Sequence, residues 1–227
     1  MTIVLTPVEA RVIGCLMEKE VTTPEHYPLS LNALTAACNQ KSNRDPAMDL
    51  DEAGVQAVVD GLMKRHLVSD RAGYGGRVPK YRQSFCNTTF GSLQFTDLER
   101  AVLCELLLRG PQSAGELRTR CQRMTPVAEI TLVDAALEAL AVHAAGPFVE
   151  KLPRRSGARD PRWMHLLGGA APAAEAESVD AAVAPVVSAA TTSPQRPALV
   201  ERVEHLEKEM AALRHEVAML RGRLPPG

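Results

Sequence analysis

Aromatic residues are scarce in this 227-residue chain, which carries four Phe, three Tyr and one Trp, or 4% of the sequence. We therefore expect its cores to be built mainly from Leu, Val, Ala and Ile. The formal net charge is −1, so any attraction for nucleic acid or anionic lipid requires a local patch. No window approaches the roughly 18 apolar residues of a membrane-spanning helix, and the N-terminus lacks the pattern of a signal peptide. The sequence predicts a soluble, cytoplasmic protein.

Cysteine pairs and catalytic motifs are also missing. The five cysteines include no Cys-x-x-Cys pair, which argues against a disulfide framework or a zinc ribbon and predicts reduced, mostly buried thiols. The sequence contains no His-Glu-x-x-His, Gly-x-Ser-x-Gly, phosphate-loop or dinucleotide-binding motif. Its histidines are scattered singly among the expected elements. We predict no enzyme activity, no cofactor and no metal site.

An internal repeat is the main feature that is present. Residues 5–17 read LTPVEARVIGCLM, and residues 95–107, at an offset of 90, read FTDLERAVLCELL. Both segments begin with Thr-x-x-Glu, the capping box of a helix start. Apolar residues then recur at three- and four-residue spacing, which predicts one buried stripe on each helix. Two copies of one small domain are therefore expected.

Each copy continues with the same predicted order of elements. After a helix over residues 6–19, a short helix is expected from Ser30 and a third helix from Asp49 or Asp51. Two strands, at 67–71 and 78–82, enclose turn glycines. The second copy predicts helices at 96–109, after Ser113 and at 129–142, then strands at 148–152 and 162–167. Three helices followed by a β-hairpin is the order of a winged helix, a variant of the helix-turn-helix.

The predicted fold is therefore mainly α with small β-hairpins (α+β), in two tandem winged-helix domains. The first domain spans residues 1–83, a connector spans 84–95, and the second domain spans 96–167. Residues 168–196 are rich in Ala and Pro without periodicity, which predicts a flexible linker. Residues 197–224 are expected to form a coiled-coil helix.

The coiled-coil prediction rests on an unbroken heptad seam. Its members alternate at spacings of four and three residues: Leu199, Val203, Leu206, Met210, Leu213, Val217, Leu220 and Leu224. β-branched residues at a with Leu at d favour a parallel two-stranded coil. The flanking pairs Arg202–Glu207, Glu209–Arg214 and Glu216–Arg221 are all opposite in sign. The tail is expected to dimerise the chain or to dock a partner helix; the alternative is a helix that lies on its own domain.

A polar loop separates the second and third predicted helices of the first copy. Its candidate nucleic-acid-binding residues are Asn39, Gln40, Lys41, Asn43 and Arg44. Amides and cations in a loop suit phosphates, base edges or a partner backbone. The alternative is a loop that satisfies its own hydrogen bonds, with Asn43 and Asp45 capping turns.

The two predicted hairpins are basic. Residues 68–83 carry Arg71, Arg77, Lys80 and Arg82 against Asp70, a net charge of +3. Residues 151–165 carry Lys151, Arg154, Arg155, Arg159 and Arg162 against Asp160, a net charge of +4. Such hairpins can contact phosphates without reading sequence, or they can simply be solvated tips.

The third helices are less suited to DNA. In a helix-turn-helix protein the recognition helix enters the major groove and needs cations or amides on its exposed face. The first copy offers a mixed set there: Glu52, Gln56, Asp60 and Lys64. The second copy offers carboxylates, namely Glu129, Asp134 and Glu138, which phosphates repel.

Several segments resemble a known family. Residues 21–46, RVPKYR at 77–82, FCNTTF at 85–90, LLLRGPQSAGELRTR at 106–120 and RWMHLL at 162–167 resemble the YceH family of uncharacterised bacterial proteins. The resemblance covers residues 5–167 and implies two winged-helix domains. It implies no activity, cofactor or catalytic residue.

Two functions are consistent with these features. The first is a homodimeric DNA-binding protein with a role in transcription regulation, which contacts phosphates through its hairpins and polar loop. The second is a protein–protein interaction scaffold whose coiled-coil tail mediates assembly, and the acidic third helices favour it.

Overall fold

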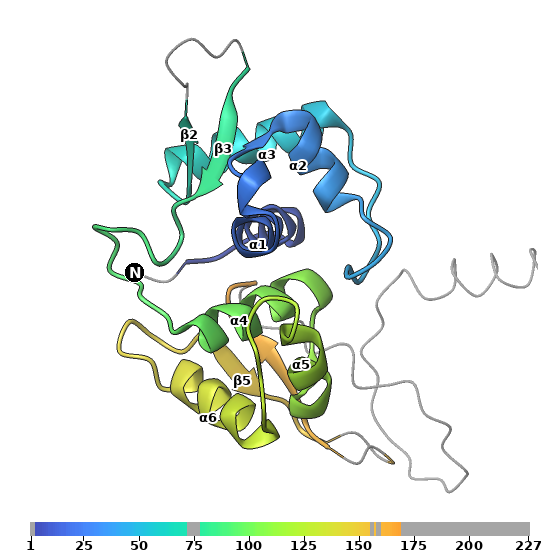
Figure 1. Ribbon diagram of the computed structural model, residues 1–227, viewed down its shortest axis with the longest axis vertical. Helices are drawn as coiled ribbons and strands as arrows, with labels where there is room; N and C mark the ends of the chain where they lie inside the picture. The colour runs from blue at the N-terminus through green and yellow to red at the C-terminus, as the bar shows by residue number, and fades with distance from the viewer. Residues whose placement is uncertain (1–2, 72–77, 155–156, 158–159, 169–227) are drawn as a thin grey trace, which may run out of the picture. The chain divides into compact units, whose positions relative to one another are not determined.

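The computed structural model describes residues 3–71, 78–154, 157 and 160–168. They all belong to one compact unit. Within these ranges the chain forms six α-helices, one 3₁₀ turn and two three-stranded antiparallel sheets (Figure 1). The linker predicted after Gly168 and the heptad seam of residues 199–224 lie outside the described residues.

The first repeat contains the elements that precede the connector. They are α1 (Pro7–Thr22), η1 (Pro24–His26), β1 (Leu29–Ser30), α2 (Leu31–Cys38), α3 (Glu52–Lys64), β2 (Val68–Arg71) and β3 (Lys80–Gln83). Strand β3 lies in the middle of its sheet, paired antiparallel with β1 and β2. The short strand β1 was not predicted, and α1 runs one turn beyond the predicted end at Lys19.

The second repeat has the same order without the 3₁₀ turn. Its elements are α4 (Asp97–Arg109), β4 (Gln112–Ser113), α5 (Ala114–Cys121), α6 (Ile130–Ala141), β5 (Val149–Lys151) and β6 (Arg162–His165). Strand β6 is central, between β4 and β5. The repeated order that the sequence predicts, three helices and then a hairpin, is therefore present in both halves.

Side-chain caps fix where the equivalent helices begin. The Thr6 amide donates to Glu9 Oε2 at 2.8 Å, and the Glu9 amide donates back to Thr6 Oγ1 at 3.3 Å. Thr96 and Glu99 form the same box at the start of α4, with the same two distances. Each box satisfies two amides that the first helical turn leaves unbonded. The predicted capping boxes are confirmed.

Helices α1 and α4 pack against each other between the two sheets (Figure 1). The prediction of one buried stripe on each helix is wrong, because α1 is buried continuously from Ala10 to Glu18 and α4 from Ala101 to Leu108. Each helix packs on its own repeat with one face and on the other repeat with the opposite face. The seam between the repeats therefore belongs to the core.

The crossing of α1 and α4 joins equivalent positions of the two repeats. The Cys104 thiol donates to the carbonyl of Gly14, 90 residues earlier, at 3.3 Å. A Cβ atom on Gly14 would lie 2.8 Å from Leu108 Cδ2, so any larger residue there would have to displace the buried Leu108 side chain. All five cysteines are buried, as predicted.

Candidate functional site

The polar loop after α2 turns its longest cation inward. The Arg44 side chain is completely buried and forms a bidentate pair with Glu18 of α1, at 3.0 and 2.5 Å. Its Nε atom also donates to the carbonyl of Ala37, and its Nη2 atom donates to Gln40 Oε1. Arg44 was a candidate phosphate ligand; the structure instead uses its guanidinium inside the protein, so this assignment is corrected.

Charge–charge contacts stabilise the ionised forms of this pair. Burial by itself would raise the pKa of Glu18, but hydrogen bonds and charges from Arg44 and Arg123 outweigh it and lower that pKa. Burial likewise would lower the pKa of Arg44, and the hydrogen bonds to Glu18 reverse the direction. The pair therefore remains charged across the physiological pH range.

The pair is part of a larger cluster that spans the seam. Arg123, which follows α5, donates to Glu18 and also to Glu105 of α4, where its Nη2 atom lies 2.5 Å from Oε1. The Arg109 Nη2 atom donates to Asn43 Oδ1 across the seam at 2.5 Å. We call Glu18, Arg44, Glu105, Arg109 and Arg123 the seam cluster. It ties the polar loop and α1 of the first repeat to α4 and the end of α5 in the second.

Some of the other loop residues form hydrogen bonds within the fold, and others face solvent. Asn39 exchanges two side-chain hydrogen bonds with the backbone of Leu50, at 2.7 and 2.8 Å, and so anchors the chain ahead of α3. Asn43 adopts a positive φ of 57°, which asparagine tolerates in turns. Lys41 is exposed. The structure thus favours the self-satisfied loop for Asn39, Gln40, Asn43 and Arg44, and leaves Lys41 available to a partner.

The hairpin cations are only partly within the described residues. Lys80 and Arg154 are exposed, whereas Arg82 and Arg162 are half-buried. The Lys151 ammonium lies 5.4 Å from the centre of the Trp163 ring, a cation–π contact across β5 and β6. Arg71 ends β2, and Arg77, Arg155 and Arg159 lie outside the described residues. Two of the predicted phosphate contacts, Lys80 and Arg154, are therefore seen to be solvent-accessible.

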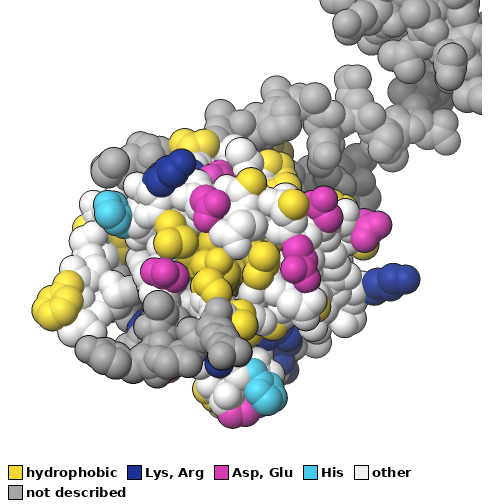
Figure 2. Space-filling view, turned by 90° about the horizontal axis from the view of Figure 1, so that it is seen from above, with side chains coloured by type: hydrophobic (Ala, Val, Ile, Leu, Met, Phe, Trp, Pro, Cys, Tyr) yellow, Lys and Arg dark blue, Asp and Glu magenta, His cyan; other side chains and the backbone are white. Residues whose placement is uncertain are grey.

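The outward face of α3 is acidic and apolar. Figure 2 views the end of the unit that carries α2, α3 and the β2–β3 hairpin, and there carboxylates surround an area of apolar side chains. On α3 the exposed residues include Ala53 and Ala57 beside Glu52 and Asp60. Lys64, in the last turn of α3, is also exposed. This face offers a phosphate backbone little attraction.

Helix α6 has two apolar stripes, and only one of them is buried. The inner stripe contains Val133, Ala136, Leu137 and Leu140. Exposed residues at spacings of three, four and three form the outer stripe: Leu132, Ala135, Ala139 and Val142. Leu132 is 49% exposed and Val142, the C-cap, is 81% exposed. Neighbouring Ile130 is 41% exposed. The sequence predicted this helix and grouped Leu132 with the residues that prove to be buried, although the spacing of the outer stripe could have revealed it.

Carboxylates lie along one edge of this outer stripe and at its N-terminal end. Glu129, Asp134 and Glu138 are all exposed, and α6 itself contains no Lys or Arg. The predicted acidic character of this helix is thus present on the solvent face. An apolar stripe bordered by acidic side chains is suited to a partner with an apolar face and basic residues along one edge.

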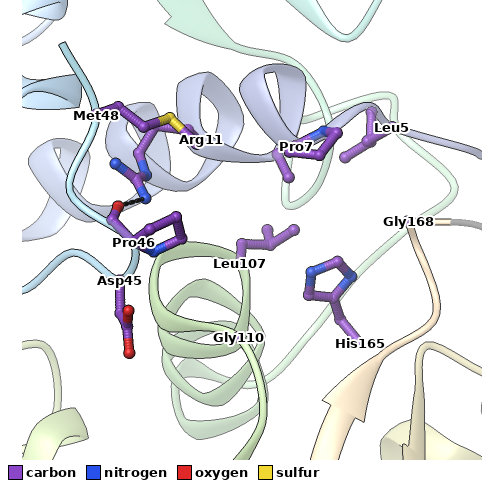
Figure 3. A pocket seen from close by; sticks show the side chains of 11 residues that line it. Leu5, Pro7, Arg11, Asp45, Pro46, Met48, Leu107, Gly110, His165 and Gly168 are labelled. Carbon is purple, nitrogen blue, oxygen red and sulfur yellow. Dashed lines mark hydrogen bonds between the residues drawn. The ribbon is translucent and has the colours of Figure 1, made fainter. Parts of the chain in front are cut away.

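A pocket of about 200 Å³ opens at the seam, next to Leu107 of α4 (Figure 3). One wall is Arg11, whose guanidinium donates to the carbonyls of Cys38 and Pro46 at 3.1 and 2.6 Å. The other wall contains His165, where burial lowers the pKa to about 4 and keeps the imidazole neutral near pH 7. Its Nδ1 atom has no hydrogen-bond partner.

Comparison with known proteins identifies the family. The model of a family described as "Protein of unknown function, DUF480" matches residues 5–158. The chain belongs to the DUF480 family. A UPF0502 protein of Vibrio atlanticus is 51% identical over 221 residues, which cover 97% of both chains. UPF0502 proteins of Photobacterium profundum and Aeromonas hydrophila are 52% and 49% identical and cover 94% and 98% of this DUF480 chain, and 93% and 100% of their own lengths.

Two further observations apply to the described ranges of this DUF480 protein. Among those residues, no helix is both long and apolar enough to cross a membrane. Within the same ranges, no group of three or more His, Cys, Asp and Glu side chains is arranged to hold a metal ion.

Proposed function

We propose that each repeat is a winged helix, with α3 and α6 in the position of the recognition helix. The hairpins β2–β3 and β5–β6 are then the wings. The shared element order supports this, as does the short strand β1 or β4 that completes each sheet. The resemblance of residues 21–46 to the YceH family implies the same fold.

We infer that the protein is a non-enzymatic interaction module that binds a protein partner through the outer stripe of α6. The observation that carries this proposal is the second apolar stripe, Leu132, Ala135, Ala139 and Val142, on the solvent side of a helix whose other side is already buried. Spacings of three and four residues are those by which one helix packs on another. Exposed apolar stripes of this kind mark interaction surfaces.

The chemistry of the stripe defines the partner. Alanines at its centre, Ala135 and Ala139, allow a second helix to approach closely, while Leu132 and Val142 provide larger contacts at the two ends. Glu129, Asp134 and Glu138 favour Lys or Arg beside the partner's apolar positions. The partner segment is accordingly an amphipathic helix with basic residues along one edge of its apolar face.

Photo-crosslinking in the source bacterium tests this proposal. A photoreactive amino acid at position 132 of the full chain should yield one discrete protein adduct, and the same group at exposed Lys41 should not. Ala139→Asp, which places a carboxylate within the stripe without touching the core, should abolish the adduct. Identical adducts at positions 132 and 41, or no adduct at 132, would contradict the proposal.

A second candidate function is DNA binding through the wings, supported by exposed Lys80 and Arg154 beside the further hairpin cations. Such binding would be independent of sequence and would weaken steeply with salt. A salt titration on mixed-sequence duplex DNA tests it. If Lys80 and Arg154 each contact a phosphate, Lys80→Ala/Arg154→Ala should reduce the slope of log K against log salt by about 2. Absence of binding at low salt would eliminate this candidate.

A further inference from the structure

Three of the four phenylalanines of this chain support the connector between the repeats. Phe85 and Phe95 are buried, with ring centres 6.4 Å apart, and Phe95 meets Phe148 edge to face at 5.1 Å. His143 completes the group, 5.3 Å from Phe95. Edge-to-face rings at such distances attract one another. The connector is therefore fixed at both ends to the aromatic part of the core.

The segment between those ends is closed by hydrogen bonds. The Asn87 side chain donates to the carbonyl of Phe95 at 2.7 Å and accepts from its amide at 2.9 Å. The Asn87 amide donates to the carbonyl of Leu93 at 2.8 Å. Gln94 Nε2 donates to the carbonyls of Thr88 and Gly91, at 2.8 and 2.9 Å. Five bonds thus close a loop of nine residues, 87–95.

The fourth phenylalanine stands at the tip of this loop. The Gly91 amide donates to the carbonyl of Thr88 at 3.1 Å, which makes a four-residue turn with Thr89 and Phe90 at its corners. Phe90 is 100% exposed. The loop therefore holds a phenyl ring in water on a backbone that is already ordered, so little conformational entropy remains to be lost when the ring binds.

We propose that Phe90 is an anchor that inserts into an apolar pocket on a protein partner. Residues 87–95 contain no charged side chain. This argues against nucleic acid, since single-stranded binding combines stacking with a basic groove. It also argues against a membrane surface, because even a myristoyl chain, with about twice the carbons of this side chain, binds only marginally without basic residues.

Because the anchor is a phenylalanine, it also restricts the chemistry of the pocket on the partner. Phenylalanine has no polar atom, so its pocket on the partner needs no buried donor or acceptor, whereas Tyr or Trp would require one. Thr88, Thr89 and Ser92 around it can hydrogen-bond to an uncharged polar rim. The partner is therefore a protein with a preformed apolar pocket about one phenyl ring wide. The pocket beside Leu107 of a second copy is a poorer receptor, because Asp45 and Arg11 line it.

This anchor is independent of the outer stripe of α6 and is tested separately. p-Benzoylphenylalanine replaces Phe90 in the full chain in the source bacterium, and the matched control carries it at exposed Ser92. One discrete adduct to a different protein is expected from position 90 only. No adduct, the same adducts at 90 and 92, or an adduct with a second copy of this chain would overturn the proposal.

The adducted protein is then purified and its affinity for the full chain is measured. Phe90→Ser should weaken binding about tenfold or more, the effect of burying one phenyl side chain, whereas Ser92→Ala should leave it unchanged. The exposed position of Phe90 implies that the urea midpoint of Phe90→Ser equals that of the wild type. Equal affinities of Phe90→Ser and wild type would overturn the proposal, whatever the crosslink shows.

Discussion

Replacing Arg44 with Met tests whether the seam cluster holds the two repeats together. The Arg44 guanidinium donates to both Glu18 oxygens and also to Gln40 and to the carbonyls of Ala37 and Asn43. Removing it takes this donor from all of those acceptors and leaves Arg123 as the arginine still bonded to Glu18, whose side chain is 1% exposed. Breaking a buried ion pair by deleting one partner destabilises proteins by about 3–5 kcal/mol. We expect Arg44→Met to lower the free energy of unfolding by about that amount.

The double variant Glu18→Gln/Arg44→Met measures the interaction energy between Glu18 and Arg44 apart from their contacts with other residues. It removes one charge of each sign and leaves Arg123 paired with Glu105. We expect it to be less destabilised than the sum of the two single variants, with a coupling of at least about 1 kcal/mol. Lys41→Met, at an exposed position of the same loop, is the control and should change stability by less than about 0.5 kcal/mol.

Urea unfolding of the full chain provides the assay, followed by far-ultraviolet circular dichroism and by fluorescence of the single tryptophan, Trp163. Because Trp163 is buried in the second repeat and Arg44 lies in the first, a shared seam should shift both transitions together. An Arg44→Met variant that loses less than about 1 kcal/mol, or whose effect adds to that of Glu18→Gln without coupling, would refute the reasoning.

Three further predictions concern the core and its pH dependence. Gly14→Ala should destabilise the chain by about 1–3 kcal/mol, because its Cβ would meet Leu108 Cδ2 at 2.8 Å. Gly61→Ala, in α3, is its control: the added Cβ would meet no atom within 4 Å beyond the backbone of its own helix, so it should stabilise the chain by up to about 1 kcal/mol in the same urea assay. Burial lowers the pKa of His165 to about 4, below its ordinary value of about 6.5, so the folded chain resists protonation that the unfolded chain accepts. The free energy of unfolding should therefore fall as the pH is lowered from about 6.5 to about 4. His165→Gln should remove this dependence in thermal melts across that range. The pKa of Glu18 is lowered, so its contribution is present above the ordinary glutamate range and is lost as the pH falls through the lowered value; Glu18→Gln should flatten the acid limb of the urea midpoint against pH.

The repeated architecture could be predicted because its signals are local. The capping boxes at Thr6 and Thr96 and the apolar spacing behind them depend on residues three or four apart. The continuous burial of α1 and α4 could not be predicted in this way. It arises because each helix also packs against the other repeat. The α1 sequence alone does not reveal which element covers the face that is turned away from its own repeat.

The candidate sites show the same division between local and long-range information. The polar loop around Arg44 predicts a surface cation. Its burial could not be predicted locally, because its partner Glu18 is 26 positions earlier and Arg123, which shares Glu18, is 79 positions later. In the sequence, Phe90 cannot be distinguished from buried Phe85 nearby. Its exposure follows from the loop of residues 87–95, which places it at the tip. By contrast, the outer stripe of α6 is a local pattern that the sequence already contained at Leu132, Ala135 and Ala139.

The claim that α6 binds a protein partner is tested most directly by the affinity of that partner. The protein captured from position 132 is purified and titrated into wild-type, Leu132→Ser, Ala139→Asp and Lys41→Ser chains. Burying the exposed half of Leu132 is worth about 1 kcal/mol, or about fivefold in affinity. We predict that loss for Leu132→Ser, a loss of at least about tenfold for Ala139→Asp, and no change for Lys41→Ser. Equal dissociation constants for all four chains would contradict the account.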